Sequence, residues 1–159
     1  MAYGCAVEKL ATQRWGSRVS FGDWAIRWSL NRKTRQIIRT PGAPSSALFS
    51  QAIKVGSTIY VSGTVGIDPR TNQLAGLTIQ EQTRQALVNC ENILHAAGAK
   101  LENVVEVYVL LARPNDFPGL NEEYAKFFPV DPPIRAVAKL GVELPNVLVS
   151  IKLTAVLGD

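Results

Sequence analysis

A capped amphipathic segment in the middle of the chain constrains the fold more than any other feature. Thr78 and Glu81 have the spacing of a capping box, in which the threonine hydroxyl and the glutamate carboxylate bind backbone amides at the start of a helix. Apolar residues recur behind them at intervals of three and four as far as Ala97, and Gly98 follows where many helices end. The pattern predicts a helix of about five turns that must bury one face.

The two faces of this predicted helix differ in chemistry. The buried stripe is expected to contain Ile79, Thr83, Ala86, Leu87, Cys90, Ile93, Leu94 and Ala97. The opposite, polar face is expected to contain Gln82, Arg84, Gln85, Asn89 and Asn92. Because Cys90 falls on the stripe, we interpret it as a core residue rather than a nucleophile. His95 is the single histidine and is expected at the helix edge without a chemical role.

Extended segments on both sides of the helix predict a sheet. Strands are expected at residues 34–40, 51–55, 58–62, 103–111, 134–140 and 147–157. The connection between residues 63 and 76 is rich in turn residues. A second helix is expected over 117–128, with an N-cap from Asn115 or Asp116. The order predicts a single α+β domain, with a mixed sheet of about six strands and two helices packed on one face.

Composition narrows the class of protein. The chain has 159 residues, of which 47% are hydrophobic and 19% are charged, as in a globular protein of one domain. No apolar run approaches the ~18 residues that span a bilayer, so a membrane partner is not expected. Two cysteines and one histidine are too few for a disulfide framework or a structural zinc site. A reducing compartment and the absence of a metal are therefore expected.

Positive charge is concentrated at the N-terminus. Residues 1–40 carry eight basic and two acidic side chains, a net charge of +6, whereas the other 119 residues carry nine and eleven, a net charge of −2. Residues 1–32 also contain all three tryptophans. We interpret residues 1–32 as an extension outside the fold, which is either a mitochondrial transit peptide or an unstructured or wrongly included segment. The folded domain is expected to be residues 33–159.

This division of the chain predicts its location and its partners. A cytoplasmic protein is expected, with the mitochondrial matrix as the alternative if residues 1–32 are a transit peptide. Nucleic acid is not an expected partner, because the excess of basic residues lies outside the folded domain.

The common catalytic arrangements are absent from the sequence. A serine-histidine-aspartate triad has only His95 to draw on, and no glycine-rich loop is followed by the lysine that a phosphate-binding loop requires. Glu122 and Glu123 are sequence neighbours on the second predicted helix, where adjacent side chains point apart. Both glutamates are therefore expected on a solvated face.

Arg135 stands in the otherwise apolar segment 132–137. A charge in such a strand must be paired, exposed at an edge of the sheet, or held for a ligand. The planar guanidinium matches a carboxylate with two parallel hydrogen bonds. From this residue alone, a structural ion pair, an exposed edge and a carboxylate ligand all stay open.

Short motifs follow one another along the chain in a characteristic order. They are SQA at 50–52, IYVSG at 59–63, GIDP at 66–69, EQTRQAL at 81–87, AAG at 96–98, NVV at 103–105, NDF at 115–117, NEEY at 121–124, FF at 127–128 and PIR at 133–135. The ordered set resembles the RidA/YjgF family of imine deaminases, also called the L-PSP endoribonuclease family. The resemblance extends over residues 34–157 and includes none of residues 1–32.

The resemblance implies a chorismate-mutase-like fold assembled as a homotrimer, with active sites between subunits. It implies hydrolysis, without a cofactor, of enamine or imine intermediates such as 2-aminoacrylate to a 2-keto acid and ammonia. Some family members have also been described as ribonucleases. By the same resemblance, Arg135 corresponds to the arginine that binds the substrate carboxylate, Gly63 to a glycine whose backbone contacts the ligand, and Asn121 to an asparagine near the site.

Three positions depart from the well-studied deaminases of the family. Phe49 stands where they have a tyrosine, so the ring that walls the pocket is kept without the hydroxyl. Ser150 stands in place of a glutamate that positions the hydrolytic water, and a serine can hold a water but is a poor general base. Val137 replaces a cysteine that some members have two positions beyond the arginine.

Three hypotheses about function remain. In the first, the protein is an imine/enamine hydrolase in which Arg135 anchors the carboxylate, Gly63 fixes the ligand through its backbone and Ser150 holds the water. In the second, it is a catalytically weakened paralogue that binds small carboxylic acids at subunit interfaces. The third, an L-PSP-type endoribonuclease, is disfavoured by the charge of the domain and by the lack of a histidine and lysine acid–base pair.

Overall fold

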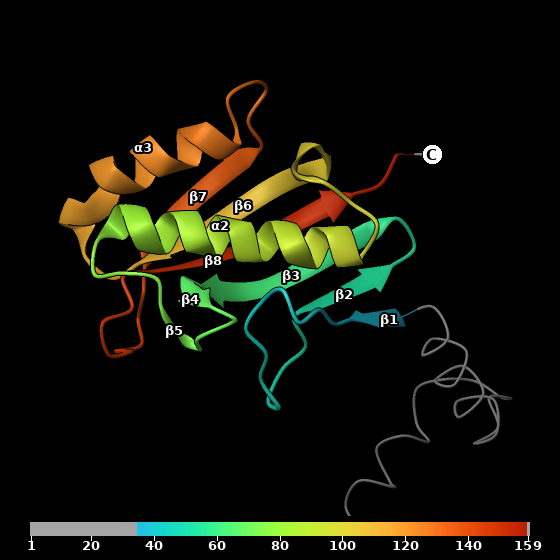
Figure 1. Cartoon of the computed structure of the whole chain (residues 1–159). Helices are drawn as coiled ribbons and strands as arrows, with labels where there is room; N and C mark the ends of the chain where they lie inside the picture. The colour runs from blue at the N-terminus through green and yellow to red at the C-terminus, as the bar shows by residue number, and fades with distance from the viewer. Residues whose placement is uncertain (1–34, 159) are drawn as a thin grey trace, which may run out of the picture. The chain divides into compact units, whose positions relative to one another are not determined.

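The computed structural model describes residues 35–158, which form a six-stranded mixed sheet (Figure 1). The strands are β1 (Arg35–Ile38), β2 (Ala52–Val55), β3 (Thr58–Val65), β6 (Val104–Leu111), β7 (Ile134–Lys139) and β8 (Val149–Val156). Their order across the sheet is β1-β2-β3-β8-β6-β7. Only β6 and β7 are parallel neighbours. The predicted extension, residues 1–32, lies outside the described residues, as do both interpretations of it.

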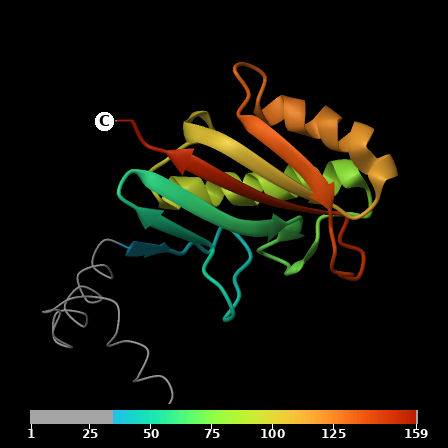
Figure 2. The same ribbon diagram turned by 180° about the vertical axis from the view of Figure 1, so that it is seen from behind.

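Two helices, α2 (Ile79–Ala96) and α3 (Phe117–Phe127), lie on the same face of the sheet (Figure 1). Figure 2 shows the other face, over which neither α2 nor α3 passes. The core fills the space between the helices and the sheet, and its largest fully buried side chains include Ile59, Leu87, Ile93, Leu94, Val107, Leu120, Ile151 and Leu153. The predicted α+β class, with six strands in the main sheet and two helices on one face, is confirmed.

The first turn of α2 has the predicted capping box. The Thr78 hydroxyl accepts a hydrogen bond from the Glu81 amide at 3.3 Å, and the Glu81 carboxylate accepts one from the Thr78 amide at 3.1 Å. Gly98 follows the helix with a φ of +81°, a left-handed conformation that glycine adopts without strain. Cys90 is fully buried, and this burial raises the pKa of its thiol to about 12. Its predicted place in the core is confirmed.

The segment predicted as turns contains a small second sheet. Strand β4 (Ile67–Asp68) pairs with β5 (Gln73–Leu74). Asp68 closes the turn between them, because its carboxylate accepts hydrogen bonds from the amide and the guanidinium of Arg70, each at 2.9 Å. Strands of two residues are too short to show an alternating hydrophobic pattern, so the sequence predicted turns alone.

Gln82 and Asn89 correct the prediction of a polar face opposite the buried stripe of α2, because both side chains are fully buried. Gln82 Nε2 donates to the carbonyls of Gly76 at 3.0 Å and Asn146 at 2.8 Å. Gln82 Oε1 accepts the amide of Leu148 at 2.9 Å. Irregular segments therefore pass along the flank of the helix, and a buried amide side chain pairs with their backbone groups.

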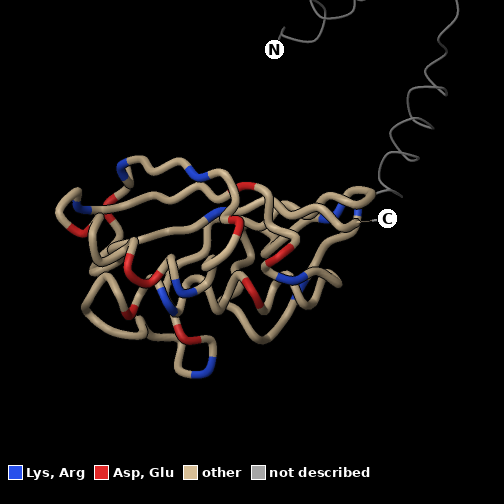
Figure 3. Tube along the Cα trace, turned by 90° about the horizontal axis from the view of Figure 1, so that it is seen from above, with Lys and Arg blue, Asp and Glu red and all other residues tan. Residues whose placement is uncertain are grey.

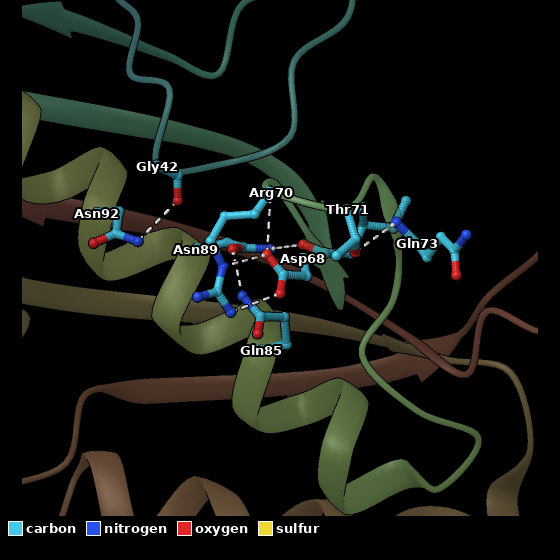
Figure 4. A network of polar contacts seen from close by, with 9 residues as sticks. Gly42, Asp68, Arg70, Thr71, Gln73, Gln85, Asn89 and Asn92 are labelled. Atoms are coloured by element: carbon cyan, nitrogen blue, oxygen red, sulfur yellow. Dashed lines mark hydrogen bonds and ion pairs between the residues drawn. The ribbon is translucent and has the colours of Figure 1, made fainter.

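Asn89 is a second buried amide side chain of α2 that binds backbone groups, about two turns after Gln82 (Figure 4). Its Nδ2 donates to the carbonyl of Val65 at 3.0 Å and to that of Ile67 at 2.8 Å, on either side of the junction between β3 and β4. One turn further, Asn92 donates to the carbonyl of Gly42 at 2.8 Å. Asn89 and Asn92, predicted on the polar face, thus attach two segments of backbone to the helix.

Glu123 corrects a second prediction. Glu122 is on the surface, where it accepts a hydrogen bond from Gln80, but the Glu123 side chain is only 3% exposed. Glu123 accepts hydrogen bonds from Lys126 on its own helix and from Arg84 on α2, the latter at 2.9 and 3.0 Å. The hydrogen bond from Lys126, and after it the bonds from Arg84, hold the pKa of Glu123 below its ordinary value. A glutamate expected in solvent instead links α3 to α2.

Asp116 is the N-cap residue of α3, as predicted, but its side chain makes no capping hydrogen bond. The carboxylate instead accepts a hydrogen bond from Arg113 Nε at 2.8 Å. The predicted capping interaction is therefore wrong, because an arginine one turn earlier competes for the same oxygen atoms.

Residues 35–158 contain neither a membrane-spanning helix nor a metal-binding cluster. None of the helices in this part of the chain is long and apolar enough to cross a membrane. Within the same residues, no three side chains of histidine, cysteine, aspartate or glutamate are grouped so that they could hold a metal ion.

Replacing Glu123 by glutamine is expected to lower the free energy of unfolding at neutral pH by about 1–2 kcal/mol, since the negative charge that faces two cations, Arg84 and Lys126, is lost. The pKa of Glu123 is lower in the folded than in the unfolded chain. Its contribution to stability is thus present above the unfolded-state pKa and is lost as the pH falls through the folded-state pKa. Urea unfolding at a series of pH values should show the two proteins converging below about pH 4.

The matched control for this experiment is Glu122→Gln, which removes a surface carboxylate one residue away. It should change the free energy of unfolding by no more than a few tenths of a kcal/mol at any pH. A gap between parent and Glu123→Gln that is as wide under acidic as under neutral conditions would contradict the role given to the buried carboxylate.

Candidate functional site

Gly63 and Ser150 are neighbours in the structure. β3 has a bulge between Val61 and Thr64, and Gly63 lies inside it. A side-chain carbon placed on Gly63 would lie 3.0 Å from Ser150 Oγ. Ser150 is 7% exposed, and it lies between Val149 and Ile151, which are completely buried. Because side chains alternate along a strand, Ser150 points to the face away from the helices.

The open face beside Gly63 is hollowed. A hollow of about 360 Å³ is lined by Gly63, Glu106, Tyr108, Leu110, Lys152, Leu153 and Thr154. Its walls combine apolar surface with one carboxylate, one ammonium group and hydroxyls. This hollow has the volume of a small-molecule site. Of the two predicted site residues on β3 and β8, Gly63 lines it directly.

Arg135 lies on the opposite face, at the edge of the sheet. It pairs with Val107, a fully buried core residue on the helix-covered face, and paired residues point to the same side. Arg135 Cζ lies 4.5 Å from the centre of the Tyr124 ring and 5.8 Å from that of Phe117, both on α3. No carboxylate among residues 35–158 forms an ion pair with it. Of the alternatives open from the sequence, the structural ion pair therefore finds no support in the described chain.

Asn121 shares a helix face with the two rings, since residues 117, 121 and 124 are spaced by four and three. Asn121 Oδ1 and the Tyr124 hydroxyl are both buried without a hydrogen-bond partner in the described chain. Burial raises the pKa of Tyr124, although the nearby Arg135 charge acts in the opposite direction. The tyrosine is therefore a neutral hydroxyl at physiological pH, beside a guanidinium that forms no ion pair with residues 35–158.

Val137 lies two residues beyond Arg135 on the same face of β7. It lines a hollow of about 290 Å³ with Leu111, Pro114, Phe117, Ala138 and Lys139. Phe117 thus borders this hollow on one side and contacts the arginine on the other. The position where some relatives have a cysteine is, in this chain, a side chain in an apolar wall.

Phe49 lies in the loop between β1 and β2, 56% exposed, and lines a third hollow of about 270 Å³. Gln51 holds this loop in shape, because its Nε2 donates to the carbonyls of Thr40, Ala43 and Pro44 and its Oε1 accepts the Thr40 amide. The next residue back is also attached to the sheet: the Ser50 carbonyl accepts a hydrogen bond from the Ser62 hydroxyl at 2.6 Å. Phe49 therefore stands near the β3 bulge that contains Gly63.

The predicted site residues thus form two groups within one chain. Gly63 and Ser150 lie on the open face, with Phe49 nearby, whereas Arg135, Val137 and Asn121 lie on the helix-covered side of the β7 edge. Ser150 pairs with Leu110 and Arg135 pairs with Val107 of the same strand, β6. Ser150 and Arg135 are therefore two strand spacings apart across the sheet and three residues apart along β6. Together these offsets separate the backbones of the two residues by about 14 Å. One subunit alone does not bring the two groups together.

Sequence reasoning missed three side chains that position these groups. Phe117 and Tyr124 were predicted only as part of the second helix, over 117–128, and their contact with Arg135 joins this helix to the following strand. Gln82 was predicted on the polar face opposite the buried stripe, but it binds the amide of Leu148, two residues before Ser150. Its one sequence signal is its spacing, three residues after Ile79 and four before Ala86, which places it beside the buried stripe.

Comparison with known proteins decides the family. The family model described as Endoribonuclease L-PSP matches residues 40–157. The chain belongs to the RidA/YjgF family. The resemblance read from the ordered motifs is therefore confirmed, and the RidA/YjgF match covers nearly all of the described residues and none of residues 1–32.

Individual RidA/YjgF relatives cover the same part of the chain. A 2-iminobutanoate/2-iminopropanoate deaminase of Mus musculus is 42% identical over 125 residues, which are 78% of this chain and 93% of the relative. The crystal structure of RidA from an Antarctic Psychrobacter bacterium has a TM-score of 0.73 and 34% identity, over 77% of this chain and 99% of that one. The crystal structure of Escherichia coli TdcF with bound serine has a TM-score of 0.73 and 28% identity, over 77% and 98%.

Proposed function

We propose that this protein hydrolyses small enamine or imine carboxylates, of the 2-aminoacrylate or 2-iminobutanoate type, to a 2-keto acid and ammonia. The observation that carries the proposal is Arg135, a guanidinium held over two rings at a sheet edge with no carboxylate partner in the described chain. Such a group suits a ligand carboxylate. The 42% identity to a mouse 2-iminobutanoate/2-iminopropanoate deaminase supports the reaction.

The reaction asks little of the protein beyond orientation. 2-Aminoacrylate first shifts a proton to become 2-iminopropanoate. Water then adds to the C=N carbon, its proton passes to nitrogen, and the resulting carbinolamine releases ammonia as the C=O bond forms. No electrons are exchanged, so the balanced reaction is imine plus water to ketone plus ammonia. Holding the substrate carboxylate on Arg135 and one water near Ser150 supplies the proximity that such a step requires.

The proposed site takes its two groups from adjacent subunits of a homotrimer. Arg135 on one face and Gly63 with Ser150 on the other meet only if a second copy brings its own face to the β7 edge. The open face carries exposed hydrophobic side chains that suit such contact: Val55, Tyr60, Tyr108, Ile134 and Val156. Closed cyclic assemblies of identical chains bring different surfaces of neighbouring copies together in this way.

One observation favours a second candidate function. The hydroxyl of Ser150 stands where the relatives' water-positioning glutamate is expected, and it cannot act as an efficient base at neutral pH. A protein that binds small carboxylic acids at the same site with weak catalysis is therefore the alternative. An endoribonuclease receives less support, because acidic and basic residues are intermingled along the described chain without a continuous basic stripe (Figure 3).

Replacing Arg135 by alanine is expected to weaken the binding of 2-oxobutanoate, a product-type keto acid, by about 100-fold or more, because a charge-assisted bidentate contact is lost. Isothermal titration calorimetry measures the affinity. The sedimentation profile should be unchanged, since Arg135 has no ion pair in the described chain. Lys139→Ala, four residues along the same strand, is the control. Equal affinity in parent and Arg135→Ala would remove the arginine from the site.

Replacing Ser150 by glutamate is expected to raise the rate of keto-acid release from freshly generated 2-aminoacrylate by about 10- to 100-fold, because a carboxylate activates water better than a hydroxyl. Ser57→Glu, in the exposed β2–β3 turn, is the matched control and should leave the rate unchanged. A parent at the buffer rate beside an active Ser150→Glu would favour the binding protein. A variant slower than the parent would contradict the place given to the water.

Co-expression of two inactive variants tests whether the site is shared. Arg135→Ala lacks the carboxylate contact, and Gly63→Leu puts a side chain where the ligand is expected. In randomly mixed cyclic trimers, about one quarter of the sites have an intact Arg135 from one subunit and an intact Gly63 from the next. Activity should therefore return to about a quarter of the parent value. No recovery in verified mixed trimers would mean that both groups act within one subunit.

A further inference from the structure

We infer that the Tyr124 ring is a positioning residue that fixes the guanidinium of Arg135 for a ligand carboxylate, with Phe117 as a second, weaker support. The inference rests on the proposed function, which supplies the carboxylate. Neither aromatic residue was among the site residues expected from the sequence.

Arg135 is held by ring faces alone in the described chain. Its Cζ lies over the Tyr124 ring at 4.5 Å from the centroid, well within the range of a cation–π contact, and near the limit of that range from Phe117 at 5.8 Å. No ion pair to a described carboxylate competes with these contacts. A contact with ring faces uses none of the guanidinium N–H groups as hydrogen-bond donors to an oxygen, so these groups can donate to a ligand carboxylate.

Tyr124 can act as a fixed support because its own position is determined by packing. The residue is 7% exposed, and its ring packs on Phe128 with 4.8 Å between the centroids and 36° between the planes. Phe117, in contrast, is 41% exposed and more distant from the guanidinium. The arginine side chain is flexible by itself, so a rigid ring beneath it lowers the entropy that ligand binding must overcome.

The ring, not the hydroxyl, is the part of Tyr124 that this role uses. The hydroxyl is buried without a hydrogen-bond partner in the described chain, and burial raises its pKa, so it carries no negative charge to pair with Arg135. Phenylalanine at this position would keep the ring face under the guanidinium. A residue such as leucine would keep apolar volume and lose the quadrupole that attracts the cation.

The test compares Tyr124→Phe and Tyr124→Leu by titration with 2-oxobutanoate. Tyr124→Leu is expected to weaken binding about five- to thirty-fold, and Tyr124→Phe to stay within about twofold of the parent. Phe127→Leu, at the same end of α3 but without a cation–π contact to Arg135, is the control and should also stay within about twofold. Phe117→Leu, at an exposed position, should weaken binding about two- to threefold and serves if Tyr124→Leu does not fold.

A double-mutant cycle separates positioning from general stability. In an Arg135→Gln background the cation that the ring attracts is absent, so Tyr124→Leu should cost much less affinity there than in the parent. An equal cost in both backgrounds, or parent-like binding by Tyr124→Leu while Arg135→Ala has lost binding, would overturn the inference and leave the proposed function intact. Failure of the parent itself to bind 2-oxobutanoate would overturn the proposed function first.

Discussion

The packing of α2 across the centre of the sheet is the constraint on which the other features depend. It requires close approach at Gly66, where a side-chain carbon would lie 2.5 Å from the carbonyl oxygen of Gln82. It also requires that the loops beside the helix find hydrogen-bond partners, which Gln82 and Asn89 supply from buried positions. Through the bond to Leu148, the same helix sets where β8 begins, and therefore where Ser150 lies.

Because both helices cover one face of the sheet, the two halves of the candidate site are separated. The β3 bulge and Ser150 face the open side, and Arg135 faces α3 at the sheet edge. This separation makes assembly part of the chemistry that we propose, since a ligand held by both groups must lie between two copies. The exposed tyrosines of the open face, Tyr60 and Tyr108, are part of the apolar surface available for that contact.

The sequence predicted the fold well where a local pattern reports directly on structure. The capping box at Thr78, the glycine at 98 and the apolar stripe of α2 all depend on neighbours within one or two helical turns. Predictions failed where the partner is distant in sequence. Glu123 was placed in solvent because the periodicity of its own helix cannot reveal Arg84, and the β4–β5 hairpin was too short for any pattern.

For the candidate site, the sequence by itself determined which chemical groups are present: a guanidinium at Arg135, a glycine at 63, a hydroxyl at 150 and a phenylalanine at 49. The ordered motifs determined the family, because their order and spacing together are specific. Only the tertiary structure decided that Arg135 rests on Tyr124 and that Ser150 lies on the opposite face. The physical reason is that strand pairing and helix packing join residues with no local relation. These contacts decide which polar groups have a partner within the protein and which are left for a ligand.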